Sequence, residues 1–284
     1  MSNLLRGCVY GQAVGDALGV PYEFKPQSSF VCTGMDGYGT HCKPAGTWSD
    51  DTSMALAICD SYRELGRIDA GDIRKRFVSW YRNGEYTCDG LFDIGNATAE
   101  ALRIGHGLAG KWDNGNGSLM RTLPLAFTDA TDDEIRKVSA ITHAHPTSTE
   151  ACVSMVRAAR ALASGVSARE AALAYGVDPD KPRGDIRSGG YVLRTYEAAL
   201  WCLANTSSFA ECVLTAVNLG DDTDTTAAVA GGLAGIVYGC EGIPQEWIAS
   251  LRGKAMIEAC LFWHSPHAWG AWRHSSKRSA AYNS

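Results

Sequence analysis

Hydrophobic residues recur at every third or fourth position along most of the chain, the spacing that places them on one face of an α-helix. The long segments do not follow the two-residue alternation of a half-exposed β-strand. The pattern predicts helices over residues 4–19, 50–65, 69–82, 95–108, 132–143, 147–164, 189–204, 208–219, 224–239 and 245–263. The predicted fold class is therefore all-α, a compact single-domain helical bundle.

Polar residues mark where two further helix starts are expected. Asp69 precedes one helix, and Ser167 with Glu170 has the spacing of a capping box, in which each side chain accepts a hydrogen bond from the other residue's free backbone N–H. Two segments rich in Gly, Pro or Ser, 25–48 and 176–188, are predicted to be loops. Long loops in compact domains often carry function, and the first of these leads directly to an acidic motif.

Two of the predicted helices carry glycines spaced four residues apart. They are Gly7, Gly11, Gly15 and Gly19 in the first, and Gly231, Gly235 and Gly239 in 224–239. Each interior glycine costs about 1 kcal/mol relative to alanine, so we expect a compensating gain from close packing of these helices. Membrane helices use similar small-residue faces, but Arg6, Gln12 and Asp16 argue against lipid around the first helix.

Composition narrows the classes of protein. With 284 residues, 45% of them hydrophobic and 20% charged, the chain can bury a large core, which excludes a disordered protein. A net charge of −5 gives no electrostatic reason to bind nucleic acid or an anionic membrane. The ten cysteines form no Cys-x-x-Cys pair and are expected to be reduced thiols in the core of a cytoplasmic protein. Neither a secretion signal nor an apolar run of about 18 residues is evident, so we expect neither export nor membrane insertion.

Acidic residues gather at the predicted starts of two helices, in TWSDDT (47–52) and GDDTDT (220–225). Serine and aspartate cap helix N-termini, so either segment alone is explained by capping. Five acids are more than capping requires: Asp50, Asp51, Asp221, Asp222 and Asp224. If the two segments meet, their carboxylates would repel each other unless protons or a cation neutralise them. Oxygen ligands favour the hard cations Mg²⁺ or Mn²⁺.

Six short motifs occur in the order seen in a known family, and the match to that family runs over about residues 4–265. They are GDALGVPYEF (15–24), SDDT (49–52), FDIGNAT (92–98), NGSLMR (116–121), TH (142–143) and NLGDDTDT (218–225). Together they resemble the ADP-ribosylglycohydrolase family, which includes dinitrogenase-reductase-activating glycohydrolase and hydrolases of ADP-ribosylarginine and ADP-ribosylserine. The resemblance implies an all-helical domain with a binuclear metal site in a central cleft.

The resemblance also implies how two divalent cations, Mg²⁺ or Mn²⁺, would be held. One would be bound by Ser49, Asp50 and Asp51, and the other by Asp222, Asp224 and Thr225, with Asp224 as the bridge. Two positions depart from the family pattern. Ser49 stands where the family usually has threonine, which keeps the hydroxyl, and Asp221 stands where it usually has glycine. Neither change removes a ligand.

Two further carboxylates gain a role from the resemblance. Taken alone, Glu23 would be a solvated surface residue and Asp93 a helix cap. In the family, the residue matching Glu23 lies beside the metals and is thought to act on water or to gate the site. The residue matching Asp93 faces the guanidinium or the opened ribose in the arginine-processing branch, and a carboxylate is a natural partner for guanidinium.

The segment 114–118, NGNGS, is expected to precede an apolar helix and therefore suits an anion, because glycine lets the backbone approach it and the helix N-terminus supplies free N–H groups. Read without the resemblance, it is an ordinary turn. With the resemblance, Asn116, Gly117 and Ser118 form a diphosphate-binding segment. His143, which alone would be a structural histidine, becomes a contact to the distal part of ADP-ribose, and His145 has no assigned role.

The implied activity is metal-dependent removal of ADP-ribose from a modified protein, with arginine as the favoured acceptor. The alternatives are serine-linked, O-acetyl or nucleic-acid-linked ADP-ribose as substrate, or a catalytically silent ADP-ribose-binding or structural protein. Intact ligand positions count against silence. The domain is expected over residues 1–274, followed by a polar tail at 275–284. Its expected partners are the ADP-ribosylated protein and the product ADP-ribose, and neither nucleic acid nor a membrane.

Overall fold

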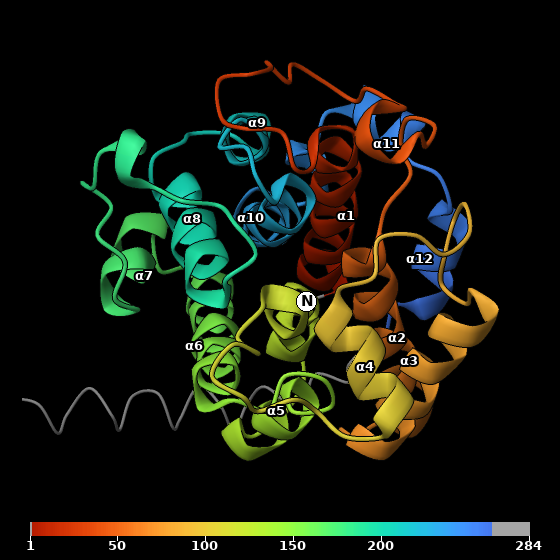
Figure 1. Ribbon diagram of the computed structural model, residues 1–284. Coiled ribbons are helices and arrows are strands. Elements are labelled where there is room, and N and C mark those ends of the chain that lie inside the picture. Colours follow the sequence, from red (N-terminus) through yellow and green to blue (C-terminus); the bar gives the residue numbers. More distant parts are fainter. Residues whose placement is uncertain (1, 263–284) are drawn as a thin grey trace, which may run out of the picture.

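The computed structural model describes residues 2–262, and its regular structure is helical (Figure 1). The α-helices are α1 (Ser2–Gly19), α2 (Asp50–Leu65), α3 (Ala70–Asn83), α4 (Asn96–Ile104), α5 (Asp132–Ser139), α6 (Pro146–Ala163), α7 (Ala168–Ala174), α8 (Val192–Ala204), α9 (Phe209–Val217), α10 (Thr223–Tyr238), α11 (Gln245–Ser250) and α12 (Lys254–Cys260). Within this part of the chain there are isolated β-bridges but no strand. The predicted all-α class is confirmed. The predicted end of the domain at residue 274 and the tail at 275–284 lie outside the described residues.

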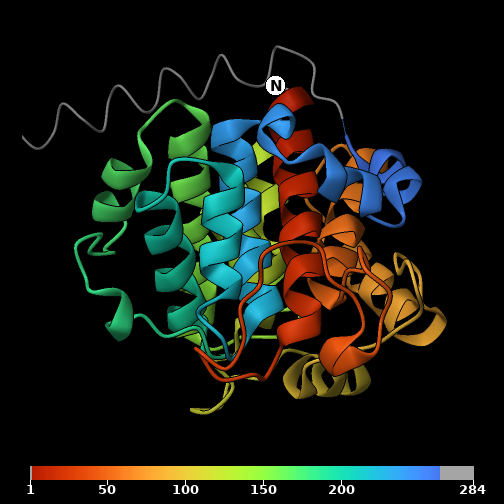
Figure 2. The same ribbon diagram turned by 90° about the horizontal axis from the view of Figure 1, so that it is seen from above.

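The centre of the molecule is the pair α1 and α10, which lie side by side in both views (Figures 1 and 2). Their backbones touch because glycines face each other. A Cβ on Gly11 would lie 2.2 Å from the Gly231 carbonyl oxygen, and a Cβ on Gly7 would lie 2.4 Å from that of Gly235. Such distances leave no room for a side chain. The predicted close packing of these two helices is confirmed.

The remaining helices surround this pair. On one side α10 packs against α8 and α9, and α6 and α7 pack against α8. On the other side α1 packs against α2, which in turn contacts α3 and α12. Figure 2 shows the succession from α6 and α8 through α10 and α1 to α2. This arrangement brings the first turns of α2 and α10 to the same region of the central pair.

Several predicted boundaries differ from the structure. The segment 245–263, predicted as one helix, is split into α11 and α12, because Leu251 is extended and Gly253 has a φ of +63°. Gly239, predicted to lie in the packed stripe, ends α10 as its C-cap with a φ of +70°. The two predicted helix starts are confirmed: Asp69 caps α3, and Ser167 with Glu170 forms a capping box on α7.

Two composition-based expectations can be compared with the described residues. None of the helices over residues 2–262 combines the length and apolar character that crossing a bilayer requires. All ten cysteines are free, and most of them are buried. Cys42 is exposed and Cys88 is only half-buried, so the prediction of core thiols is wrong for these two.

Candidate metal and substrate site

The acidic starts of α2 and α10 meet beside the central helix pair. Ser49 caps α2, and its hydroxyl also donates to Asp51 Oδ2 at 3.0 Å. The same Asp51 oxygen accepts a hydrogen bond from Thr225 Oγ1 in α10 at 3.3 Å. The capping explanation, in which each acid stays on its own helix end, therefore does not describe these segments. Close packing at Gly19, where a Cβ would lie 2.3 Å from Asp224 Cα, fixes the first turn of α10 against α1.

Asp16 in α1 accepts hydrogen bonds from residues at the start of α2. One of its carboxylate oxygens accepts the Ser49 backbone N–H at 2.8 Å, and the other accepts the Thr52 N–H at 3.0 Å and its hydroxyl at 2.6 Å. Asp16 is fully buried, and burial raises its pKa to about 7 although these hydrogen bonds oppose the shift. Asp16, Asp51 and Asp224 each place an oxygen within 4.8 Å of the other two.

The donor set fits a divalent cation. Asp51 Oδ1, Asp222 Oδ1 and Asp224 Oδ2 are buried side-chain oxygens with no hydrogen-bond partner, which is costly for a carboxylate. Burial raises the pKa of Asp51 and of Asp224 well above the ordinary value, and neighbouring carboxylates add to both shifts. A hard cation would satisfy these oxygens and neutralise their charge. The residues present can hold metal ions.

Asp221 does not belong to this cluster. Its side chain is exposed, and its backbone pairs with the segment after Glu23 through hydrogen bonds to and from Phe24 and Lys25. Its φ of +57° lies in the left-handed region, which glycine adopts most easily and aspartate tolerates. The backbone conformation therefore accounts for either residue at this position.

A cavity of about 260 Å³ lies beside the acidic starts of α2 and α10. Most of the sequence-predicted site residues line it, namely Glu23, Asp50, Asp93, Asn116, Gly117, His143, Asp222 and Thr225. Four do not: Ser49, Asp51 and Asp224, which are buried in the first turns of α2 and α10, and Ser118. The structure thus places predicted metal ligands beneath and along one cavity that also contains the predicted catalytic carboxylates.

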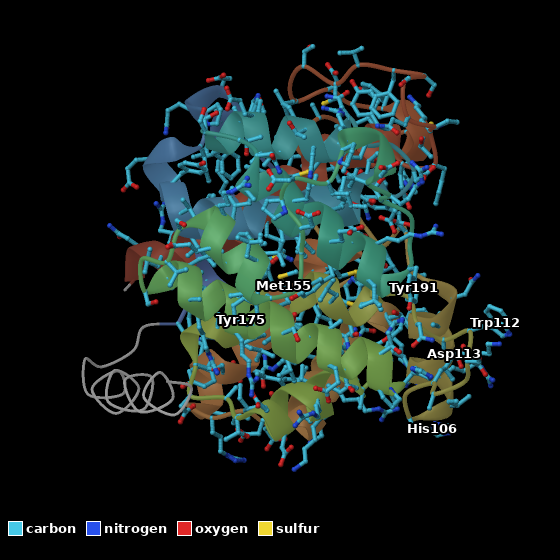
Figure 3. The ribbon with its side chains drawn as sticks, turned by 90° about the vertical axis from the view of Figure 1, so that its left-hand side faces the viewer. His106, Trp112, Asp113, Met155, Tyr175 and Tyr191 are labelled. Carbon is cyan, nitrogen blue, oxygen red and sulfur yellow. The ribbon has the colours of Figure 1, made fainter. Side chains whose placement is uncertain are left out.

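One wall of the cavity is the segment around Asn116. The Asn116 N–H donates to Gly190 O at 3.0 Å, and its side-chain amide donates to Asp222 Oδ2 at 2.9 Å. Figure 3 shows Tyr191 near this edge, with the cavity-lining Trp112 and Asp113 on an outlying loop. Trp112 is 87% exposed.

The prediction of an apolar α-helix after this segment is wrong. Residues 116–121 and 123–127 form short 3₁₀ helices, so no α-helix N-terminus points at a ligand here. Ser118 is fully buried, and its hydroxyl faces Ser139 Oγ at 3.0 Å and Cys152 Sγ at 3.4 Å. Its side chain is therefore directed into the core rather than toward the cavity.

The two histidines of the TH motif region have different environments. His143 lines the cavity and is 2% exposed, and burial lowers its pKa to about 3, which keeps the ring neutral. Its Nδ1 is 2.8 Å from Thr142 Oγ1. His145 caps α6 by accepting the Thr147 N–H at 3.2 Å. The role left open for His145 is therefore structural.

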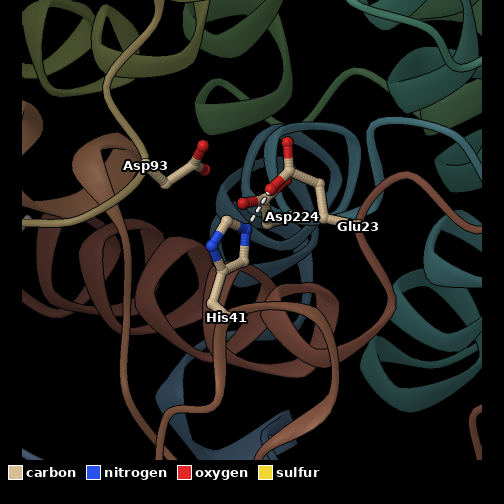
Figure 4. Close-up of side chains that lie close together, drawn as sticks. All are labelled: Glu23, His41, Asp93 and Asp224. Atoms are coloured by element: carbon tan, nitrogen blue, oxygen red, sulfur yellow. Dashed lines mark hydrogen bonds and ion pairs between the residues drawn. The ribbon is translucent and has the colours of Figure 1, made fainter.

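Glu23 and Asp93 lie on opposite sides of Figure 4, and His41 forms a hydrogen bond with Glu23. The ligand atoms of Glu23, His41, Asp93 and Asp224 all lie within 4.8 Å of one another. Burial raises the pKa of Glu23 to about 7, and hydrogen bonding to His41 opposes the shift. Asp93 has a φ of +50° and lies before Gly95, the N-cap of α4, so it is not a helix cap.

Two residues of the site, Asp16 and His41, were not among those predicted from the sequence. Asp16 lies in a quoted motif, but its contact to α2 depends on the close approach of separate helices. His41 stands alone in an irregular loop with no periodic pattern around it. The sequence did indicate that loop 25–48 carries function, but this indication did not single out His41.

Comparison with known proteins identifies the family to which this chain belongs. The sequence model described as ADP-ribosylglycohydrolase matches residues 2–271. This chain belongs to the ADP-ribosylglycohydrolase family. Among its relatives is an ADP-ribosylarginine hydrolase of Pseudomonas putida, 38% identical over 89% of this chain and 75% of the relative. An ADP-ribosylarginine hydrolase of Serratia proteamaculans is 36% identical over 92% of this chain and 79% of the relative.

Two further matches extend the comparison. The ADP-ribosyl-[dinitrogen reductase] glycohydrolase of Rhodospirillum rubrum is 31% identical over 89% of this chain and 91% of the relative. A solved structure titled ADP-ribosylglycohydrolase-related protein complex superimposes with a TM-score of 0.77 at 30% identity, covering 91% of this chain and 96% of the other. The family and enzyme class predicted from the sequence are confirmed.

Proposed function

We propose that this protein is a divalent-cation-dependent hydrolase that removes ADP-ribose from arginine side chains of modified proteins. The observation that carries the proposal is the set of buried, unpartnered oxygens on Asp51, Asp222 and Asp224 beside a cavity of about 260 Å³. The arginine acceptor is supported by the names of the relatives that are 38% and 36% identical.

In this proposal two cations, Mg²⁺ or Mn²⁺, occupy the acidic cluster. One would be held by Ser49, Asp50 and Asp51, and the other by Asp222, Asp224 and Thr225. Bound there, the cations would supply Lewis acidity and a template for neighbouring ribose hydroxyls. Asn116 orients the cluster by donating its side-chain N–H to Asp222.

The cavity walls would bind the rest of ADP-ribose. Gly117 leaves space for the His143 ring at the cavity wall, because a Cβ there would lie only 2.8 Å from His143 Cε1. The neutral ring of His143 can form hydrogen bonds with the ligand without introducing charge. Ser118 would serve by fixing this segment to the core, since its hydroxyl faces Ser139 and Cys152.

Glu23 is the proposed general base. Its carboxylate lies at the cavity beside the cluster, where it can accept a proton from the water that attacks the anomeric carbon. The bond between that carbon and the guanidine nitrogen then breaks with its electron pair staying on the nitrogen, and Glu23 passes the proton taken from water to the leaving guanidine. Asp93, across the cavity from Glu23, would hold the guanidinium by a charge-assisted hydrogen bond.

The arginine assignment is tested with Asp93→Asn, which keeps the shape of the side chain and removes its charge. A charge-assisted contact of about 1.5 to 3 kcal/mol predicts a loss in kcat/KM of roughly tenfold or more for arginine-linked peptide. Asp178→Asn is the matched control, because Asp178 is an exposed aspartate outside the cavity and accepts its hydrogen bond from the Asp180 N–H. We expect the control to keep the parent rate.

The experiment compares release of ADP-ribose from arginine-linked and serine-linked peptides, with melting curves to show that each variant is folded. A folded Asp93→Asn protein with the parent rate would contradict the role of Asp93. A parent protein that prefers the serine linkage would contradict the arginine assignment and leave the metal site in place.

A further inference from the structure

We propose that His41 is a positioning residue that holds the Glu23 carboxylate in the orientation needed for proton transfer. The Nε2 atom of His41 forms a hydrogen bond with Glu23 Oε2, shown as a dashed line in Figure 4. Both side chains are largely buried, at 15% and 7% exposed. The inference rests on the role proposed above for Glu23.

The turn that carries His41 is fixed to the backbone around Glu23. Thr40 Oγ1 donates to the Glu23 carbonyl oxygen at 2.8 Å. Gly39 packs directly on Pro21, because a Cβ at Gly39 would lie 2.1 Å from the Pro21 carbonyl oxygen, and its φ of +54° favours glycine. The backbone of the turn therefore cannot move independently of the segment that precedes and includes Glu23.

The ring of His41 is also held by packing. Its centroid lies 5.3 Å from that of Phe92 and 6.1 Å from that of Phe24. Lys43 places its ammonium 4.8 Å from the centre of the Phe92 ring and donates to the Asp89 carbonyl oxygen at 2.8 Å. These contacts connect the turn to the segment that leads into Asp93, and they direct Nε2 toward Glu23.

Glu23 needs such a partner because of what surrounds it. It follows a short 3₁₀ helix and its own backbone is not helical (φ −51°, ψ 142°), so no α-helix constrains its side chain. Carboxylate oxygens of Asp93 and Asp224 lie within 4.8 Å of its own. Repulsion among these like charges favours rotation of the Glu23 side chain away from the cluster. A hydrogen bond from a rigidly packed ring opposes that rotation.

The central test uses two substitutions, one that removes the hydrogen-bond donor and one that supplies it again. His41→Phe keeps a ring against Phe92 but removes the hydrogen bond, and His41→Gln restores an N–H donor at similar reach. We expect His41→Phe to lower kcat on arginine-linked peptide about tenfold to a hundredfold, the range for a misplaced reacting group, with KM and melting temperature unchanged. His41→Gln should recover most of the loss. His106→Phe, at an exposed histidine, is the control and should match the parent.

A double-mutant cycle shows whether His41 acts through Glu23. In a Glu23→Gln background, His41→Phe should cause no further fall in kcat, whereas independent roles would multiply the losses. ADP-ribose affinity, measured by calorimetry, should be the same in His41→Phe and the parent. If His41→Phe is too unstable to purify, His41→Ala, which also lacks the donor, takes its place in the comparison with His41→Gln and in the cycle with Glu23→Gln.

Failure of this inference can be told apart from failure of the proposed function. A parent protein that hydrolyses arginine-linked substrate while folded His41→Phe keeps its kcat, or loses the same factor in both backgrounds, overturns the positioning role alone. A parent that releases ADP-ribose from no tested linkage overturns the proposed function and this inference with it. The positioning role of His41 would be established by three results together. The kcat falls in His41→Phe, it recovers in His41→Gln, and His41→Phe causes no further fall in the Glu23→Gln background.

Discussion

Replacing Gly19 by alanine should weaken metal binding, although this glycine is not itself a ligand. A Cβ at this position would lie 2.3 Å from Asp224 Cα and 2.4 Å from Asp224 N. Non-bonded carbon atoms prefer separations of about 3.5 to 4.0 Å, so α1 and the first turn of α10 must separate by about 1 Å. The neighbouring atoms are backbone, which cannot relieve the clash by changing rotamer. Asp224 must therefore move with the helix.

The matched control is Gly7→Ala at the other end of the same packed face. Its Cβ would lie 2.4 Å from the Gly235 carbonyl oxygen, a clash of similar depth far from the acidic cluster. Overpacking costs about 1 to 3 kcal/mol, and the higher helix propensity of alanine returns about 1 kcal/mol. Each variant should therefore lose up to about 2 kcal/mol of stability, which is up to roughly 8 °C in melting temperature.

The assay is circular-dichroism melting in chelator together with calorimetric titration of Mn²⁺. Both variants should melt lower than the parent, but only Gly19→Ala should bind Mn²⁺ more weakly, by about tenfold or more, as for other changes that displace a metal ligand indirectly. Unchanged Mn²⁺ affinity in folded Gly19→Ala, or an equal loss in Gly7→Ala, would refute the link between helix packing and the position of Asp224.

Further predictions concern the acidic cluster. Mg²⁺ or Mn²⁺ at millimolar concentration should raise the melting temperature of the chelator-treated protein, because ligands that bind the native state stabilise it by mass action; no shift would contradict the metal site. Asp224→Ala should abolish turnover and Asp221→Ala should not, since only the first side chain lies in the cluster; equal losses would show that the ligand register is wrong. In chelator, stability should fall as pH rises from about 4 to about 8, because burial raises the pKa of Asp16 and of Glu23 to about 7 and the folded state then holds more protons than the unfolded chain; denaturant titrations at several pH values that show the opposite slope would contradict it.

Local patterns were sufficient to predict much of the fold. The helix predicted over 50–65 has the bounds observed for α2, because its apolar period and acidic start lie within the segment itself. The pairing of α1 with α10 followed from glycine spacing, which only close backbone packing compensates. The break between α11 and α12 was not predictable in this way. It depends on a distant residue, since Gly253 packs where a Cβ would lie 2.3 Å from the Trp48 ring.

The candidate site was predictable where residue type alone limits the chemistry. Clustered carboxylates at two helix starts indicated a hard cation, and the structure brings Asp51 and Thr225 together. The 3₁₀ geometry after Asn116 was missed, because its apolar residues resemble those of a helix and Pro124 interrupts the segment without marking its form. The contact of His41 with Glu23 was missed because it depends on how a long irregular loop folds back.

The most direct test of the account is release of ADP-ribose from an arginine-linked peptide by the purified protein, measured in Mg²⁺ or Mn²⁺ and in excess EDTA. The account predicts free ADP-ribose and unmodified arginine peptide with the cation, loss of release on chelation, and recovery when the cation is restored. Full turnover in EDTA by protein that elemental analysis shows to be metal-free would contradict the central claim.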